Sequence, residues 1–257
     1  MIIAVGSWRG IGATTTALLA ATVLAEQHGE AWLIEADPAG GVLAGRLSLP
    51  PHAVGGLERV AFPADRSAPL DDLFAVAHPL GRLQLVTAPA DPFRAHACHL
   101  PRAPWPSALR QLDAPVVVDI GRLRGGTAAW PVLTLADSVL LVAAPEVAAA
   151  VAAAEWIDAA GRVSPADPGL PGRTARVVMV DSPGGIAFSE ASLRHDLAGD
   201  WGGWLPWEPT TVDLVLRGAG PHDRRVRRSA LLSAMRDVVA TLAPSRPTVA
   251  TFDEVLR

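Results

Sequence analysis

The chain begins with MIIAVGSWRGIGATTT (residues 1–16), which joins an apolar run to a glycine-rich turn. The run (residues 2–5) is short and β-branched, as is typical of a strand buried on both faces of a parallel sheet. A stretch rich in Ala, Leu and Thr follows (residues 14–28) and is suited to a helix. The N-terminus therefore predicts a strand, a glycine turn and a helix in succession.

The same pattern recurs along the chain and defines the expected fold. Further apolar runs lie at residues 31–36, 83–88, 116–120, 138–143 and 176–180, and helical stretches lie at 148–161 and 225–242. Alternation of strands and helices predicts an α/β fold with a single doubly wound, mainly parallel sheet flanked by helices. We expect the runs at 2–5 and 116–120 to be interior strands, and ligands to bind at the carboxyl ends of the strands.

Segments rich in Pro and Gly connect stretches of similar composition. They lie at residues 49–56, 61–69, 101–106 and 165–172. Since none separates two different compositions, we interpret them as surface loops of one domain, residues 1–243, with a C-terminal tail at 244–257.

Composition excludes several classes of protein. Of the 257 residues, 50% are hydrophobic and 19% are charged, which is far from the signature of a disordered chain. All 22 basic residues are Arg and there is no Tyr, so mechanisms that need a lysine or a tyrosine are excluded. The single cysteine, Cys98, excludes an internal disulfide and a Cys-rich metal site.

Charge and hydropathy indicate whether the protein is attracted to nucleic acid or lipid and whether it spans a membrane. A net charge of −4 and a pI near 6.0 give no overall attraction to nucleic acid or anionic lipid. No apolar stretch reaches the roughly 18 residues of a membrane-spanning helix. We expect a cytoplasmic protein.

The glycine turn has two interpretations. Backbone N–H groups of such a turn and the N-terminus of the following helix can bind a phosphate group. Alternatively, the glycines only permit a tight connection between strand and helix. The residues of the turn leave both readings open.

The glycine turn resembles a loop of one enzyme family whose catalytic residue types are absent from this chain. Gly6-x-x-x-Gly10-Ile11-Gly12 resembles the cofactor loop of short-chain dehydrogenases. That family uses a Tyr and a Lys for its proton chemistry, and this chain has neither. A dinucleotide-binding Rossmann-type relic without dehydrogenase catalysis is all that this resemblance allows.

A second resemblance extends over most of residues 1–220. The loop at residues 8–15 resembles the deviant P-loop of the MinD/ParA ATPases, with Trp8 and Ala13 at the positions of its two lysines, and is thus degenerate. Four further segments resemble the family in order: LIEADPAGG (33–41), LQLVTAPADP (83–92), VVVDIG (116–121) and ADSVLLVAAPE (136–146). The Gly-Ala-Thr-Thr loop and the Ala-Pro-Ala-Asp segment are most similar to the CpaE/TadZ branch, which localises pilus machinery.

The MinD/ParA resemblance implies roles for particular residues. It places Mg²⁺ at Thr14 and Asp119, and it makes Asp37 the catalytic carboxylate that positions the attacking water. It places ATP on the loop formed by Arg9, Gly10, Ile11, Gly12, Ala13, Thr14 and Thr15. Because no lysine neutralises the phosphates, we expect weak or no ATP hydrolysis.

The same residues also have structural interpretations. Thr14 can cap a helix and Asp37 can form an Asp-Pro turn. Asp119 ends an apolar strand, where an acid without a partner is costly, which favours a functional role. Arg9 can replace part of the missing lysine charge or lie on the solvated surface.

A basic cluster opens the last predicted helix. Arg224, Arg225, Arg227 and Arg228 could contact nucleic acid or an anionic membrane, or form a solvated helix start.

The MinD/ParA resemblance implies a homodimeric positioning or assembly factor for pilus, secretion, partition or division machinery. It also implies recruitment to the inner face of the membrane or to the cell pole. The alternative to nucleotide binding is a nucleotide-free dimeric scaffold.

Overall fold

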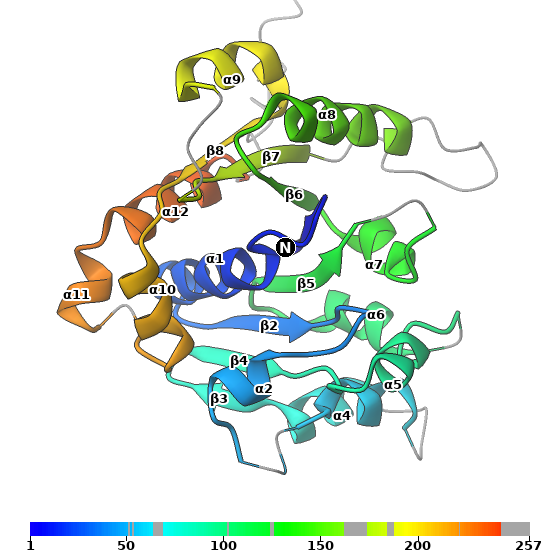
Figure 1. Ribbon diagram of the computed structural model, residues 1–257. Helices are drawn as coiled ribbons and strands as arrows, with labels where there is room; N and C mark the ends of the chain where they lie inside the picture. The colour runs from blue at the N-terminus through cyan, green and yellow to red at the C-terminus, as the bar shows by residue number, and fades with distance from the viewer. Residues whose placement is uncertain are drawn as a thin grey trace, which may run out of the picture.

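Eight strands pair into one sheet in the computed structural model of the chain, in the order β3-β4-β2-β5-β1-β6-β7-β8 (Figure 1). The structure describes residues 1–242 except 51, 53, 64–68, 102, 124–125, 162–173, 184–187 and 221. The predicted tail at 244–257 and the predicted loop at 165–172 therefore lie outside the described residues.

The strands are β1 Ile2–Ser7, β2 Ala31–Glu35, β3 His78–Leu80, β4 Leu83–Val86, β5 Val116–Arg122, β6 Ser138–Ala143, β7 Thr174–Val180 and β8 Trp201–Leu205. The helices that precede β6 are α1 Ala13–His28, α2 Leu43–Arg46, α3 Gly56–Ala61, α4 Pro69–Val76, α5 Pro92–Ala97, α6 Trp105–Ala108, the 3₁₀ turn η2 Leu109–Gln111 and α7 Trp130–Leu135. The later ones are α8 Val147–Gly161, α9 Glu190–Leu197, the 3₁₀ turn η3 Ala198–Asp200, α10 Pro209–Leu216, α11 Arg224–Arg227 and α12 Ala230–Ala240.

The pairing confirms the predicted doubly wound sheet. Neighbouring strands are parallel throughout, except that β3 runs antiparallel to β4 at one edge. β5 and β1 lie side by side in the middle, and all six residues of β1 are buried. The uninterrupted apolar runs are thus interior strands, as expected.

Helices cover both faces of the sheet and enclose two hydrophobic cores. One core joins β-strand side chains to α1, α10, α11 and α12, and the other joins them to α3, α4 and α6 to α9. α1 packs against β1, β2 and β5 and also against α12, which itself packs on β8 (Figure 1). These contacts on several sides explain why its residues from Thr16 to Ala25 are all buried instead of forming one apolar stripe. Among the described residues, no helix is long and apolar enough to cross a membrane.

Two predictions about elements were wrong. The helix expected at 225–242 is divided into α11 and α12, because Ser229 adopts an extended conformation and its hydroxyl accepts from the Leu232 N–H at 3.1 Å. The segment at 101–106, expected as a surface loop, includes the start of α6. There Trp105 is fully buried and its indole N–H donates to the Cys98 carbonyl at 2.8 Å.

Candidate functional site

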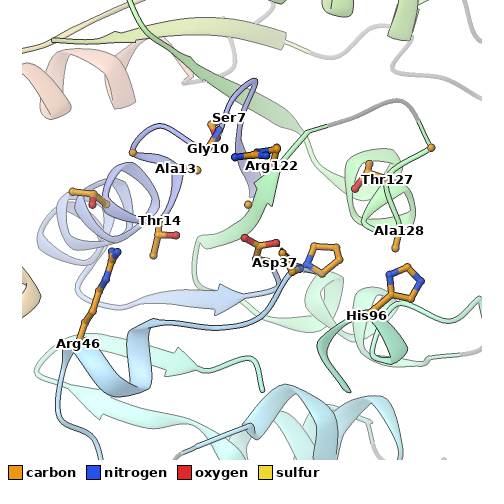
Figure 2. Close-up of a pocket in the computed structure, with 16 residues that line it drawn as sticks. Ser7, Gly10, Ala13, Thr14, Asp37, Arg46, His96, Arg122, Thr127 and Ala128 are labelled. Atoms are coloured by element: carbon orange, nitrogen blue, oxygen red, sulfur yellow. Dashed lines mark hydrogen bonds between the residues drawn. The ribbon is translucent and has the colours of Figure 1, made fainter. Parts of the chain in front are cut away.

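A pocket of about 720 Å³ opens at the carboxyl ends of β1, β2 and β5 (Figure 2). A doubly wound sheet places its ligands at this edge. The lining residues come from the loops after these strands, from α1, α2 and α5, and from the segment before α7. They are Ser7, Gly10, Gly12, Ala13, Thr14, Thr15, Asp37, Pro38, Ala39, Arg46, His96, Gly121, Arg122, Gly126, Thr127 and Ala128.

The glycine turn is built for a close approach of backbone. Gly10 (φ 79°) and Gly12 (φ 66°) both adopt the left-handed conformation, which favours glycine. Gly12 is the N-cap of α1. Because glycine has no side chain, this cap offers no acceptor to the first N–H groups of the helix. The helix N-terminus therefore meets the pocket without a side-chain cap from Gly12, as an anion site requires.

Asp119 and Thr14 lie together beside this turn. Asp119 is fully buried in the middle of β5, which continues to Arg122 and does not end at Asp119 as the sequence suggested. Its Oδ1 accepts from the Gly121 N–H at 3.0 Å. Its Oδ2 has no hydrogen-bond partner among the described residues. Burial raises the pKa of Asp119 to about 7, although the nearby Thr14 hydroxyl opposes the shift.

These two side chains fit a magnesium ion. A carboxylate oxygen without a partner and a hydroxyl are hard oxygen ligands, and Mg²⁺ in phosphate sites takes only one or two such protein ligands. No cluster of three or more His, Cys, Asp or Glu side chains in the described part of the chain could hold a metal by itself. Water and nucleotide phosphates would have to complete the coordination.

Asp37 lines the same pocket, with Thr14 and Arg122 around the cavity (Figure 2). Its Oδ1 accepts from the Ala39 N–H at 2.8 Å. The carboxylate lies so close to the Gly121 backbone that a Cβ there would be 2.0 Å from Asp37 Cγ. Burial raises the pKa of Asp37, while the Ala39 N–H and the Arg122 charge lower it.

Glu35 has a structural role that the sequence left unassigned. Its buried carboxylate accepts from the backbone N–H groups of Val42 at 2.6 Å, Leu43 at 2.8 Å and Ala88 at 3.1 Å. Burial raises the pKa of Glu35, and these three N–H groups oppose the shift. Glu35 thus holds the start of α2 beside the end of β4.

Arg9 and Ile11 lie apart from the other expected nucleotide contacts. They line a separate pocket of about 100 Å³ with Trp8, against residues of β6 and the start of α8. Gly10, Gly12, Ala13, Thr14, Thr15 and Asp37 line the main pocket, and Asp119 adjoins Thr14.

Sequence reasoning missed Arg46, His96 and Arg122, which line the main pocket (Figure 2). Arg122 follows the apolar run of β5 by one turn residue, which is the one signal that could have indicated it. In a chain with 22 arginines, that signal is weak.

The basic cluster forms most of α11, away from α5 and α7 at the pocket (Figure 1). Arg225 pairs with Asp223, with 3.0 Å between Nη2 and Oδ2. Arg224, Arg227 and Arg228 are exposed and form no ion pair with the described residues. α11 and its C-cap residue Arg228 therefore form a basic surface.

No protein-family model matches the sequence, and no curated protein matches it. The structure is similar to the cell division ATPase MinD of Pyrococcus furiosus, with a TM-score of 0.68 at 16% identity over 93% of this chain and 96% of that one. A ParA family ATPase of Chlorobium tepidum gives a TM-score of 0.67 at 14% identity, over 93% and 97% of the two chains. The septum site-determining protein MinD of Pyrococcus horikoshii, complexed with Mg-ADP, gives 0.67 at 14% identity, over 95% and 97%. The chain therefore has the fold of the MinD and ParA ATPases.

Proposed function

We propose that this chain binds ATP or ADP with Mg²⁺ at the glycine turn and acts as a MinD/ParA-like positioning or assembly factor. The observation that carries the proposal is the buried, unpartnered Asp119 Oδ2 beside Thr14, at the N-terminus of a helix without a side-chain cap. The Mg-ADP complex of the structurally similar Pyrococcus horikoshii MinD supports it.

In this proposal one group of residues binds the nucleotide and the metal, and Asp37 acts on the attacking water. Backbone N–H groups of residues 11–15 would bind the phosphates, since the Gly10 N–H donates to Ser7 Oγ at 2.8 Å. Thr14 and Asp119 would hold the metal. When bound, Mg-ATP would supply a phosphoryl group for transfer to water. Asp37, whose pKa is raised by burial, would orient that water and hold its proton.

Hydrolysis is expected to be slow. Ala13 occupies the position of the P-loop lysine, so the turn itself provides no side-chain charge to stabilise the transition state. Phosphate release from purified protein should stay well below about 1 s⁻¹, the lower end of ordinary enzyme turnover. Turnover at or above that value would show that another group supplies the charge effectively.

Calorimetric titration with ATP and ADP, with and without Mg²⁺, tests the binding. Thr14→Ala and Asp119→Asn should weaken Mg-ATP binding by about tenfold or more, because the first removes a ligand hydroxyl and the second removes the negative charge of the ligand carboxylate. The matched control is Thr22→Ala, which lies two turns further along α1 and whose hydroxyl donates to the Leu18 carbonyl. It should bind Mg-ATP as the wild type does.

Two other results of the titration would favour a function other than ATP binding. Absence of heat and of a thermal shift with millimolar ATP and ADP would favour a nucleotide-free dimeric scaffold. Binding of NAD or NADP in preference to ATP would instead favour the dinucleotide-binding relic.

The proposal extends to assembly. A homodimer, and a cargo in pilus or secretion machinery like that of the CpaE/TadZ branch, follow from the resemblance of the loop and of the Ala-Pro-Ala-Asp segment. The basic surface on α11 is the candidate contact with nucleic acid or with the inner face of the membrane. Light scattering with and without Mg-ATP tests the dimer, and cosedimentation with anionic vesicles or DNA tests the contact.

A further inference from the structure

The candidate site lacks the charge that a phosphate-binding loop ordinarily contains. The chain has no lysine, and the methyl group of Ala13 is nearly buried. Arg9 lines a different pocket. Backbone N–H groups provide partial charges only, so a triphosphate in this pocket needs full positive charges from elsewhere in the chain.

Arg122 brings one guanidinium over the glycine turn. Its Nη2 donates to the Arg9 carbonyl at 3.1 Å, and a Cβ on Gly10 would lie 2.7 Å from the same nitrogen. The guanidinium is thus packed against the backbone of Gly10. Arg122 comes from the end of β5, three residues after Asp119, so the strand that carries the metal ligand also positions this charge.

Arg46 brings a second guanidinium from a different side of the pocket (Figure 2). It is the last residue of α2, whose start is held by the hydrogen bonds from Val42 and Leu43 to Glu35. Its placement therefore depends on the buried carboxylate of Glu35.

Neither guanidinium is neutralised by a close ion pair. Within the described residues, Arg46 and Arg122 form no ion pair with a carboxylate. Among the described residues that line the pocket, Asp37 is the one acidic side chain. Two arginines and one carboxylate line the cavity of about 720 Å³, and the buried Asp119 carboxyl, whose pKa is raised to about 7, adjoins it beside Thr14.

We propose that Arg122 and Arg46 bind the phosphate groups of the nucleotide in place of the missing loop lysine. This inference rests on the proposed nucleotide binding and assigns its charged contacts. Planar guanidinium groups match phosphate oxygens in a bidentate geometry, which a lysine cannot do. The Arg122 bond to the Arg9 carbonyl leaves further N–H donors of its guanidinium for a ligand.

Calorimetry with Mg-ATP and with inorganic tripolyphosphate tests the inference on the full-length protein. Arg122→Gln removes the charge and leaves a shorter side chain with an N–H donor, and Arg46→Gln removes the second charge. Each should weaken binding of both probes about tenfold to a hundredfold, as expected for a hydrogen bond to a charged group. Arg122→Lys should recover part of the loss, because it restores the charge without the planar geometry.

Arg82→Gln is the matched control. Arg82 precedes β4, at the opposite end of the strands from the site, and lines a different pocket. This variant removes the same charge from the chain and should bind both probes as the wild type does. Thermal unfolding of every variant verifies that the fold is retained. If Arg122→Gln fails to fold, calorimetry with Arg122→Lys still tests whether the guanidinium of Arg122 contributes to binding.

The outcomes separate this inference from the proposed function. Mg-ATP binding that changes less than twofold in the Gln variants would overturn the role of the arginines and leave nucleotide binding in place. Wild-type binding of tripolyphosphate but not of ATP or ADP, weakened by the Gln variants, would support the arginine site and contradict the proposed function. Wild-type protein that binds neither probe would overturn both.

Discussion

At the scale of single residues, burial controls the titration of side chains near the site. His99 is buried beside Trp105, with ring centroids 5.8 Å apart in an edge-on arrangement. Its Nε2 has no hydrogen-bond partner among the described residues. Burial lowers the pKa of His99 to about 4, although a hydrogen bond to the Ala36 backbone favours the charged form.

His99 should make the protein sensitive to acid. Between pH 6.5 and about 4 the unfolded chain binds a proton that the folded chain does not, so this residue's contribution to the free energy of unfolding falls as the pH falls. The total change is roughly 3 kcal/mol, from about 1.4 kcal/mol for each pKa unit. Urea unfolding of wild type and His99→Asn, at steps between pH 7 and pH 4, measures it.

The comparison with the variant isolates this histidine. Asp119 and Glu35 have raised pKa values and act in the opposite direction over the same pH range, so the wild-type curve alone mixes several groups. Asparagine retains an N–H donor near the Ala36 backbone but does not titrate. We expect the wild type to lose stability relative to His99→Asn as the pH falls, and a constant difference would contradict the assignment.

At the scale of elements, caps decide where the C-terminal helices begin and end. Asp223 accepts from the Arg225 N–H at 2.8 Å and begins α11, and Ser229 begins α12. Val226 is buried between these caps, so the short α11 is anchored to the core. Capping side chains thus interrupt a stretch whose composition favours one continuous helix.

Ser229→Ala should destabilise the protein by about 1 kcal/mol, because it removes the acceptor for the Leu232 N–H at the start of α12. Chemical denaturation of the two proteins measures the loss. Ser233→Ala is the control, since Ser233 is exposed within the same helix and alanine is the better helix former. If both variants were equally stable, the cap would not be what begins α12.

At the scale of the whole molecule, the sheet separates two hydrophobic cores. Val117 in β5 belongs to the core that contains α1 and α12, and Val139 in β6 belongs to the opposite one. β1 lies between β5 and β6. Side chains that point to opposite faces of non-adjacent strands share no packing partners.

Val117→Ala and Val139→Ala should each cost about 2 kcal/mol, from the transfer of two methyl groups and the small cavities that remain. The double variant should lose the sum to within about 0.5 kcal/mol, because the two sites are independent. Equilibrium unfolding of the four proteins completes the cycle. A coupling well above that value would show that the two cores act as one.

Part of the candidate site could be predicted from the order of segments along the chain. Asp37 follows an apolar run, Asp119 lies near the end of another, and Thr14 begins the helix after the first run. A parallel sheet brings the carboxyl ends of such runs to one edge. Arg9 also follows the first apolar run and is therefore expected at the site. Its side chain instead lies in another pocket, because the glycine turn directs residues 8, 9 and 11 away from the main cavity. A sequence does not show in which direction a side chain of a tight turn points.

The sequence by itself determined the class of fold and the position of its interior strands, because burial on both faces leaves an uninterrupted apolar run that is readable locally. It did not indicate the edge strands β3 and β8, in which most residues are only partly buried, so that neither strand is an uninterrupted apolar run. Only the tertiary structure decided that Glu35 holds α2 and that Arg46 and Arg122 reach one cavity. Those arrangements depend on pairs of residues far apart in the chain, and their chemistry exists only once the sheet has brought them together.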